Sequence, residues 1–420
     1  MVIARGLLVL AGAIALNAAA ATLLPLDVGA QHVPGFLNPT VAGVIAADFE
    51  GIGHDDIAVA GMQRPGSPYG MTSGEAHSGF VAILRFNTQS QTYAIVQTLV
   101  TDDADLAGIA LDPTSSAGPG LVVVSQAGTL TRYSGWPLQL ISHVSLKQYV
   151  SGMQVGDVDG DGRPDVVVTH PVSGLAAYDL VTGALERTYA GRAGNSLALA
   201  QLDADPALEI VLSGTPGYVV DGATNATDWE YAGGIGGVLA AGTVLAGNGQ
   251  GFVAAESRYL SAFRSTPYSP IWSLDGGYTA VDFAAIDGSP RLLLGSSDGV
   301  LEVLDPVTQA IQANLVADPV GHLAAGHLED ATVLQVVSSS GLSTTAGDSL
   351  QIHGFDGSLR FALDDEDGPF VVAAPGDVDG DGRADGLWAS YYSASEYEGG
   401  YIHIYDPITG AERSRAMLTD

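Results

Sequence analysis

Two loops of this sequence place aspartates at a spacing that suits a hard metal ion. In the first loop, Asp157, Asp159, Asp161 and Asp165 occupy positions 1, 3, 5 and 9, with glycines at positions 4 and 6. Left empty, carboxylates this close together would repel one another. Ca²⁺ takes about six to eight oxygen ligands, and a backbone carbonyl at Arg163 would complete such a shell. Because Mg²⁺ keeps more of its waters, the pattern favours Ca²⁺ as the cofactor.

A second loop farther along the chain repeats this pattern. An EF-hand would need Glu at position 12 and a helix after the loop. That position is Val168 in the first loop and Trp388 in the second, each within a predicted strand. This excludes an EF-hand and leaves a solvated acidic turn as the alternative to a calcium site. The candidate ligands of the second loop are Asp377, Asp379, Asp381, Arg383 and Asp385.

Two further loops keep only part of the pattern. In one, Asp48, Glu50 and Asp56 keep the spacing, but Ile52 replaces the third acid, so these candidate ligands leave calcium binding open. The other loop is two residues shorter, and its spacing favours a structural acidic turn over a metal site. Its acids are Asp203, Asp205 and Glu209.

The acidic loops belong to an internal repeat of about 45 residues. Late in several units a D-x-x-T segment recurs, at Asp179, Asp221, Asp305 and Asp406, and predicts a hairpin turn. Continuous apolar runs such as 166–169 predict inner strands covered on both faces. Four short strands in each repeat of this length are typical of a propeller blade.

We therefore predict an all-β fold, a single β-propeller of eight blades with four antiparallel strands in each. The alternatives are a seven-bladed propeller with an N-terminal cap, or two smaller β-domains. The predicted propeller spans residues 41–420, with units near 41–100, 101–146, 147–192, 193–233, 234–277, 278–319, 320–366 and 367–420.

The loops at 156–165 and 376–385 resemble the FG-GAP/VCBS repeat of integrin-α-like propellers. The resemblance is specific in two units, recognisable in two more, and extends over 41–420 through the repeat period. It implies a calcium-stabilised propeller, usually extracellular, that acts in cell adhesion or ligand binding. The D-x-x-T-G hairpins are similar to those of quinoprotein-type propellers, which implies an enzyme as the alternative.

The composition is acidic and free of cysteine. The chain has 420 residues, with 47 Asp and Glu against 15 Lys and Arg, and a formal net charge of −32. Nucleic-acid binding through phosphate contacts needs a basic surface, so no nucleic-acid partner is expected. The absence of cysteine excludes a disulfide scaffold, a thiolate zinc site and a cysteine nucleophile.

The first residues have the pattern of a secretory signal peptide. Arg5 precedes an apolar run of about a dozen residues, and small residues end near Ala21. We expect a signal peptide at 1–21 and a lead segment at 22–40; a buried helix or a membrane anchor is the alternative. Later segments are too short or too polar to span a membrane. The sequence therefore predicts a secreted, periplasmic or cell-surface protein without a membrane span after cleavage.

Three long loops are expected on the propeller face opposite the acidic loops. They cover 61–78, 338–348 and 390–399, in units that ring closure makes neighbours. Tyrosine combines a large contact area with a polar end, which favours a protein or carbohydrate ligand on this face. Such loops also tolerate insertions that have no function. The candidate contact residues are Arg64, Tyr69, His77, Tyr391, Tyr392 and Tyr397.

The sequence contains no recognisable catalytic motif. Its nine histidines are scattered without an H-E-x-x-H segment. No G-x-S-x-G elbow or P-loop follows a predicted strand and opens a helix, as these catalytic motifs require. We therefore expect a non-catalytic adhesion or recognition module. The alternative is a secreted enzyme, a polysaccharide lyase-like protein or a quinone-dependent dehydrogenase, whose site would be assembled in the channel from separate blades.

Overall fold

The computed structural model describes the chain from the first strand onward, with gaps. The described residues are 36–64, 78–87, 89, 92–100, 106–246, 249–256, 258–286, 289–317, 319–330, 333–339, 348–366, 370–372, 376–378, 380, 386–390, 400–405 and 412–418. The predicted signal peptide at 1–21 lies outside them. The first strand begins at Phe36, so the first sheet extends into the predicted lead segment at 22–40.

The described residues form β-strands that are arranged in eight four-stranded sheets. The first four sheets contain β1 (Phe36–Ala47), β2 (Asp56–Arg64), β3 (Ser78–Asn87), β4 (Thr92–Val100), β5 (Leu106–Asp112), β6 (Gly120–Ser125), β7 (Thr129–Ser134), β8 (Gln139–Ser145), β9 (Gly152–Gly156), β10 (Asp165–His170), β11 (Gly174–Asp179), β12 (Leu185–Tyr189), β13 (Leu197–Ala200), β14 (Glu209–Leu212), β15 (Gly217–Val220) and β16 (Thr227–Tyr231).

The last four sheets follow in the same order along the chain. They contain β17 (Val238–Leu245), β18 (Gly249–Ala255), β19 (Tyr259–Arg264), β20 (Ser269–Asp275), β21 (Tyr278–Ile286), β22 (Ser289–Ser296), β23 (Val300–Leu304), β24 (Ile311–Val316), β25 (His322–Asp330), β26 (Val333–Ser339), β27 (Asp348–Gly354), β28 (Leu359–Glu366), β29 (Phe370–Val372), β30 (Gly386–Ser390), β31 (Gly400–Tyr405) and β32 (Glu412–Leu418).

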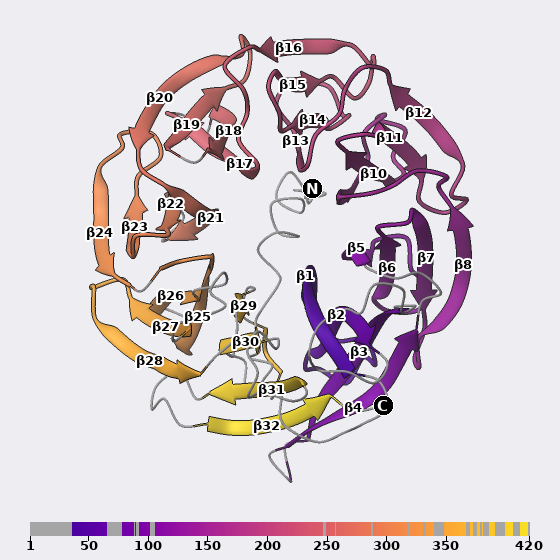
Figure 1. The fold of residues 1–420 in the computed structure, drawn as a ribbon, viewed down its shortest axis with the longest axis vertical. Helices are drawn as coiled ribbons and strands as arrows, with labels where there is room; N and C mark the ends of the chain where they lie inside the picture. The colour runs from indigo at the N-terminus through magenta and orange to yellow at the C-terminus, as the bar shows by residue number, and fades with distance from the viewer. Residues whose placement is uncertain are drawn as a thin grey trace, which may run out of the picture.

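The sheets stand around a common axis, with the first strand of each innermost and the fourth at the rim (Figure 1). Neighbouring strands within a sheet are antiparallel, as β9, β10, β11 and β12 are. The inner strand β5 contacts β1 and β9, and the ring closes where β32 contacts β4 and β31 contacts β1. The predicted all-β fold, a single propeller with four-stranded antiparallel blades, is confirmed, and the described strands form eight such sheets.

We number the blades 1 to 8 in chain order, so that blade 3 contains β9–β12. Blades 2 to 6 each contribute to two hydrophobic cores, one shared with each neighbouring blade. On β10, Val166 and Val168 pack in the core shared with blade 2. Val167 lies between them and packs in the core shared with blade 4. Successive side chains of a strand point to opposite faces, so a sheet covered on both faces needs apolar residues at every position. This explains the unbroken apolar run in the sequence. Full burial of each valine contributes about 1.5–3 kcal/mol.

The described D-x-x-T segments form the turns between the third and fourth strands of their blades. Asp179 Oδ1 accepts hydrogen bonds from the backbone N–H of Thr182 at 2.6 Å and from its hydroxyl at 2.5 Å. Gly183 follows with a φ of 66°, the left-handed conformation that closes the turn. Equivalent turns start at Asp221 and Asp305, with φ of 64° at Asn225 and 60° at Gln309.

Within the described part of the chain, no helix has the length and apolar character needed to cross a membrane.

Candidate functional site

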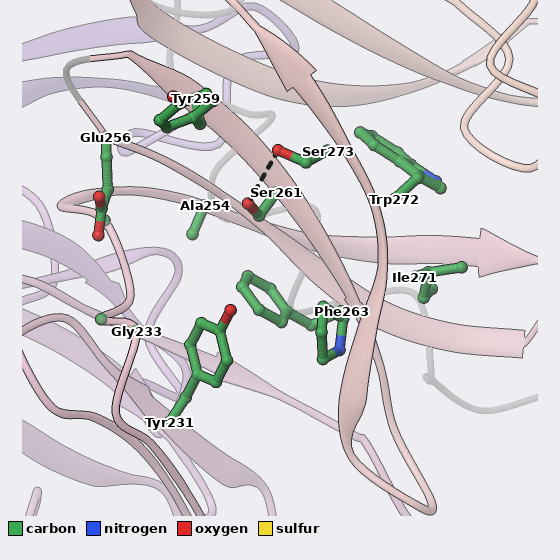
Figure 2. Close-up of a pocket in the computed structure, with 13 residues that line it drawn as sticks. Tyr231, Gly233, Ala254, Glu256, Tyr259, Ser261, Phe263, Ile271, Trp272 and Ser273 are labelled. Carbon is green, nitrogen blue, oxygen red and sulfur yellow. Dashed lines mark hydrogen bonds between the residues drawn. The ribbon is translucent and has the colours of Figure 1, made fainter.

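A cavity of about 550 Å³ lies between blades 4 and 5, at a place the sequence did not indicate. Figure 2 shows the ring of Tyr231 from β16 beside that of Phe263 from β19, with centroids 5.4 Å apart, and Glu256 and Tyr259 elsewhere in the lining. Its lining includes one carboxylate, and none of its residues is basic. The wall comes from four strands, β16, β18, β19 and β20, and from the segment that joins the two blades. Its composition can therefore be recognised only once the strands have been placed.

The acidic loop of blade 3 connects β9 to β10 and is shaped by its first aspartate. Asp157 Oδ1 accepts a hydrogen bond from Gly160 N at 2.7 Å, and Oδ2 accepts one from Gly162 N at 2.9 Å. Both glycines have left-handed backbones, with φ of 75° and 87°. A side chain would be strained at those φ values, so the alternating glycines are what allow the loop to wrap around one carboxylate.

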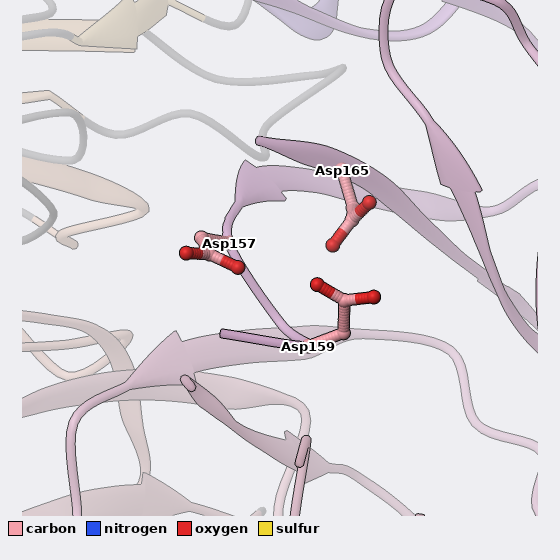
Figure 3. A group of neighbouring side chains, drawn as sticks. All are labelled: Asp157, Asp159 and Asp165. Carbon is pink, nitrogen blue, oxygen red and sulfur yellow. The ribbon is translucent and has the colours of Figure 1, made fainter. Parts of the chain in front are cut away.

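Three of the four predicted aspartates of this loop converge. Asp157, Asp159 and Asp165 each offer one oxygen, and these oxygens lie within 4.8 Å of one another. Figure 3 shows the carboxylates of Asp159 and Asp165 facing each other, with Asp157 beside them. Calcium–oxygen distances are about 2.3–2.6 Å, so oxygens on opposite sides of one ion are about 5 Å apart. The observed separation therefore fits a shared calcium ion, and all the donors are the hard oxygens that this ion prefers.

The electrostatics of this loop also favour a cation. Asp165 is 3% exposed, and Val158 N donates a hydrogen bond to its Oδ2 at 3.0 Å. Burial, together with the neighbouring Glu186 carboxyl, raises the pKa of Asp165 well above the usual range of an aspartate. Arg187 Nη2 lies 3.6 Å from Asp159 Oδ2 at the edge of the group. A divalent ion would supply the positive charge that the buried Asp165 carboxylate lacks.

Asp161, the fourth predicted ligand, is not part of this converging group. Its Oδ1 accepts a hydrogen bond from Arg163 N at 2.8 Å, and the residue is exposed. The side chain therefore stabilises its own turn. Spacing alone placed Asp161 in the shell, and its role as a ligand stays a prediction. The carbonyl ligand expected at Arg163 stays a prediction.

The shorter loop of blade 4 brings its acids together, although its spacing favoured a purely structural turn. Asp203, Asp205 and Glu209 each offer an oxygen, and these lie within 4.8 Å of one another. Burial raises the pKa of Glu209 to about 7, and the charges of Asp203 and Asp205 act in the same direction. Glutamate has one methylene more than aspartate, which lets its carboxylate meet the other two acids in a loop that is two residues shorter.

In blade 1 an arginine lies against the candidate ligands. Arg85, on β3, binds Asp56 with two hydrogen bonds, Nε to Oδ1 at 2.8 Å and Nη2 to Oδ2 at 3.0 Å, and Nη1 also pairs with Glu50. Asp56 is fully buried, and burial raises its pKa even though the guanidinium opposes the shift. Two of the three predicted ligands thus have a permanent cation as their partner. The third, Asp48, accepts hydrogen bonds from Gly51 N, Ile52 N and Gly53 N.

The acidic loop of blade 8 is described only at its start. Asp377 Oδ1 accepts a hydrogen bond from Gly380 N at 2.7 Å, which matches the Asp157–Gly160 contact of blade 3. The Asp377 carbonyl accepts a hydrogen bond from Asp55 N of blade 1 at 2.7 Å. The predicted ligands Asp379, Asp381, Arg383 and Asp385, and the hairpin residue Asp406, lie outside the described residues.

The predicted contact residues of the long-loop face are not described at the level of side chains. Arg64 ends β2, but its side chain lies outside the described part. The remaining residues, Tyr69, His77, Tyr391, Tyr392 and Tyr397, lie wholly outside it. The partner site on this face stays a prediction.

Comparisons with known proteins identify the fold and no family. No protein-family model matches the chain, and no curated protein matches it. Among solved structures, Sqt1 from Saccharomyces cerevisiae is similar with a TM-score of 0.55 and 10% identity, over 96% of this chain and 100% of that one. BamB from Moraxella catarrhalis has a TM-score of 0.49 and 15% identity, over 74% and 87% of the two chains. At this identity, the similarity to Sqt1 supports the propeller fold alone.

Proposed function

We propose that this protein is a calcium-binding β-propeller that acts as a non-catalytic recognition module. The convergence of Asp157, Asp159 and Asp165 in blade 3 carries the proposal, because three hard oxygen donors lie within 4.8 Å of one another, close enough for one calcium ion to bind all three. The FG-GAP/VCBS-like spacing of the loop supports the same ion. Asp157 and Asp159 would hold the ion from the loop, and Asp165 from the start of β10.

The role of the ion in this proposal is to stabilise the fold. The Asp157 carbonyl accepts a hydrogen bond from Leu208 N of blade 4 at 3.0 Å, so the loop also joins two blades. An ion that binds only the folded state stabilises it by about 2.7 kcal/mol when present at 100 times its dissociation constant. An extracellular calcium concentration of about 1 mM suits the weak sites found in extracellular modules.

The test is thermal unfolding of the full chain in calcium and in excess chelator. We expect the melting temperature to fall on chelation, because the buried Asp165 loses its counter-charge. Asp159→Asn should remove most of the contribution of this site. Asp161→Asn, the matched control in the same loop, should keep it, since Asp161 lies outside the converging group. Identical melting curves of the unmodified protein with and without chelator would contradict the proposal.

The location and the partner are part of the same proposal. The signal-peptide pattern at 1–21 supports a secreted, periplasmic or cell-surface protein, and the tyrosine-rich long loops support a protein or carbohydrate ligand on that face. Replacing residues 65–77 by a short turn should abolish ligand binding on a glycan or protein array while calcium-dependent stability is kept. A loop-replaced protein that binds as well as the unmodified one would refute this part.

A further inference from the structure

The loop that joins β13 to β14 in blade 4 contains a carboxylate whose partners are incomplete. Glu209, the first residue of β14, is 0% exposed. Its Oε2 accepts a hydrogen bond from Leu202 N, whereas Oε1 is buried and has no hydrogen-bond partner. An oxygen buried in this way has lost its hydration without compensation unless something binds it. Glu209 belongs to the converging group with Asp203 and Asp205, so a cation bound by these acids would satisfy this oxygen.

A second oxygen without a partner lies in the same loop. Gln201 donates a hydrogen bond from Nε2 to the Asp205 carbonyl, which holds its amide beside the acidic group. Its Oε1 is buried and has no hydrogen-bond partner. Side-chain amide oxygens are ligands of calcium together with carboxylates. The loop therefore offers a neutral oxygen in addition to the three acids.

The acids of blade 4 also lack a positive partner. Among the ion pairs of the described residues, none includes Asp203, Asp205 or Glu209. Blade 1 is different, because there the guanidinium of Arg85 neutralises the buried acid at the start of the second strand. The charge of a buried acid that has neither an arginine nor a bound cation beside it destabilises the folded state by its full desolvation free energy.

We propose that Asp203, Asp205 and Glu209 form a second divalent-cation site, of the calcium type, distinct from the site in blade 3. The carboxylates supply the charge, and Gln201 is positioned to add a neutral oxygen. The site does not depend on the nine-residue aspartate spacing, because the longer Glu209 side chain spans the gap left by the shorter loop. The protein would therefore bind one more calcium ion than its two full aspartate loops provide.

Calcium stoichiometry of the full chain, measured by equilibrium dialysis of purified variants, tests the proposal. Glu209→Gln and, separately, Asp203→Asn should each lose one bound calcium ion relative to the unmodified protein. The matched control is Glu230→Gln, which removes one negative charge from an exposed position on β16 of the same blade and should retain all bound calcium. Far-UV circular dichroism establishes that each variant is folded, and Asp203→Asn leaves the buried carboxyl intact.

The outcomes distinguish this site from the one in blade 3. Loss of one calcium ion in both blade 4 variants, with a further ion lost when Asp159→Asn is added, supports two separate sites. Unchanged stoichiometry in both blade 4 variants would overturn the proposal, because a protonated Glu209 would then explain the buried oxygen. That result would not count against the blade 3 site, because the calcium bound by Asp159→Asn tests that site separately.

Discussion

The first residue of the second strand is a buried acid in three described blades, and its charged neighbours are of two kinds. In blade 1, Asp56 pairs with Arg85. In blade 3, Asp165 faces Asp157 and Asp159, and in blade 4 Glu209 faces Asp203 and Asp205. All three acids are 3% exposed or less. A buried carboxylate needs a counter-charge or a proton. The same position thus forms an internal ion pair in blade 1 and lies in an acidic cluster in blades 3 and 4, where we propose a metal ligand.

Asp282 is a half-buried acid on another strand, and its titration makes stability depend on pH. It lies on the inner strand β21, accepts a hydrogen bond from Phe283 N at 2.8 Å, and burial raises its pKa to about 7. The unfolded chain titrates near pH 4. The folded state therefore binds the proton more tightly, and stability decreases as the pH rises from about 4 to about 7. Above about pH 7, Asp282 is charged in both the folded and the unfolded state, and the loss of stability stays constant.

We therefore expect Asp282→Asn to raise the free energy of unfolding at pH 8 and to change it little at pH 5. The gain at pH 8 should be about 1–2 kcal/mol, below the full value of the shift because the residue is half-buried. Urea unfolding at the two pH values measures it. Asp275→Asn, at an exposed position of β20, is the control. An equal effect of Asp282→Asn at both pH values would show that its titration has no part in stability.

At the scale of strands, β3 determines how blade 1 differs from its neighbours. Ile57 pairs with Leu84 in the ladder between β2 and β3, which brings Arg85 beside Asp56. The corresponding ladder of blade 3 pairs Asp165 with Asp179. The Arg85 guanidinium also lies 4.6 Å from the ring centroid of Trp136 in the next blade. One residue on β3 thus gives the buried acid of blade 1 a positive partner from the chain itself and also contacts the neighbouring blade.

Replacing that arginine should destabilise the protein without any change in calcium. Arg85→Met leaves the buried Asp56 without a partner, which we expect to lower the free energy of unfolding by about 3 kcal/mol. Arg264→Met on β19 is the control, because Arg264 is exposed and its side chain contacts Ser269. Urea unfolding in saturating calcium compares the two. Equal stabilities would mean that the Arg85 ion pair contributes nothing.

The sequence could predict the strands and turns because they depend on local pattern. The apolar run at 166–168 and the Asp179 turn have the conformations expected from burial on both faces and from a side chain that bonds to its own backbone. The sequence could not predict the geometry of the candidate metal ligands as well. Spacing could not show that Asp161 would bond to its own turn, nor that Glu209 would reach its partners. Arg85 lies 29 residues from Asp56, so their pairing depends on strand register.

At the scale of the whole molecule, the ring brings the first and the last blade together. The contact of β32 with β4 and the hydrogen bond from Asp55 N to the Asp377 carbonyl join blade 8 to blade 1. The Asp157 carbonyl makes the equivalent bond to Leu208 N between blades 3 and 4. Acidic loops therefore lie at blade junctions in a chain of net charge −32. Cations bound there would offset repulsion and stabilise the junctions.

The most direct test of the calcium account is anomalous X-ray diffraction from crystals of the protein grown with calcium. We predict an anomalous peak between Asp157, Asp159 and Asp165, with each carboxylate contributing an oxygen at about 2.3–2.6 Å. Data at saturating calcium that show no peak there, with these carboxylates turned toward solvent, would contradict the account.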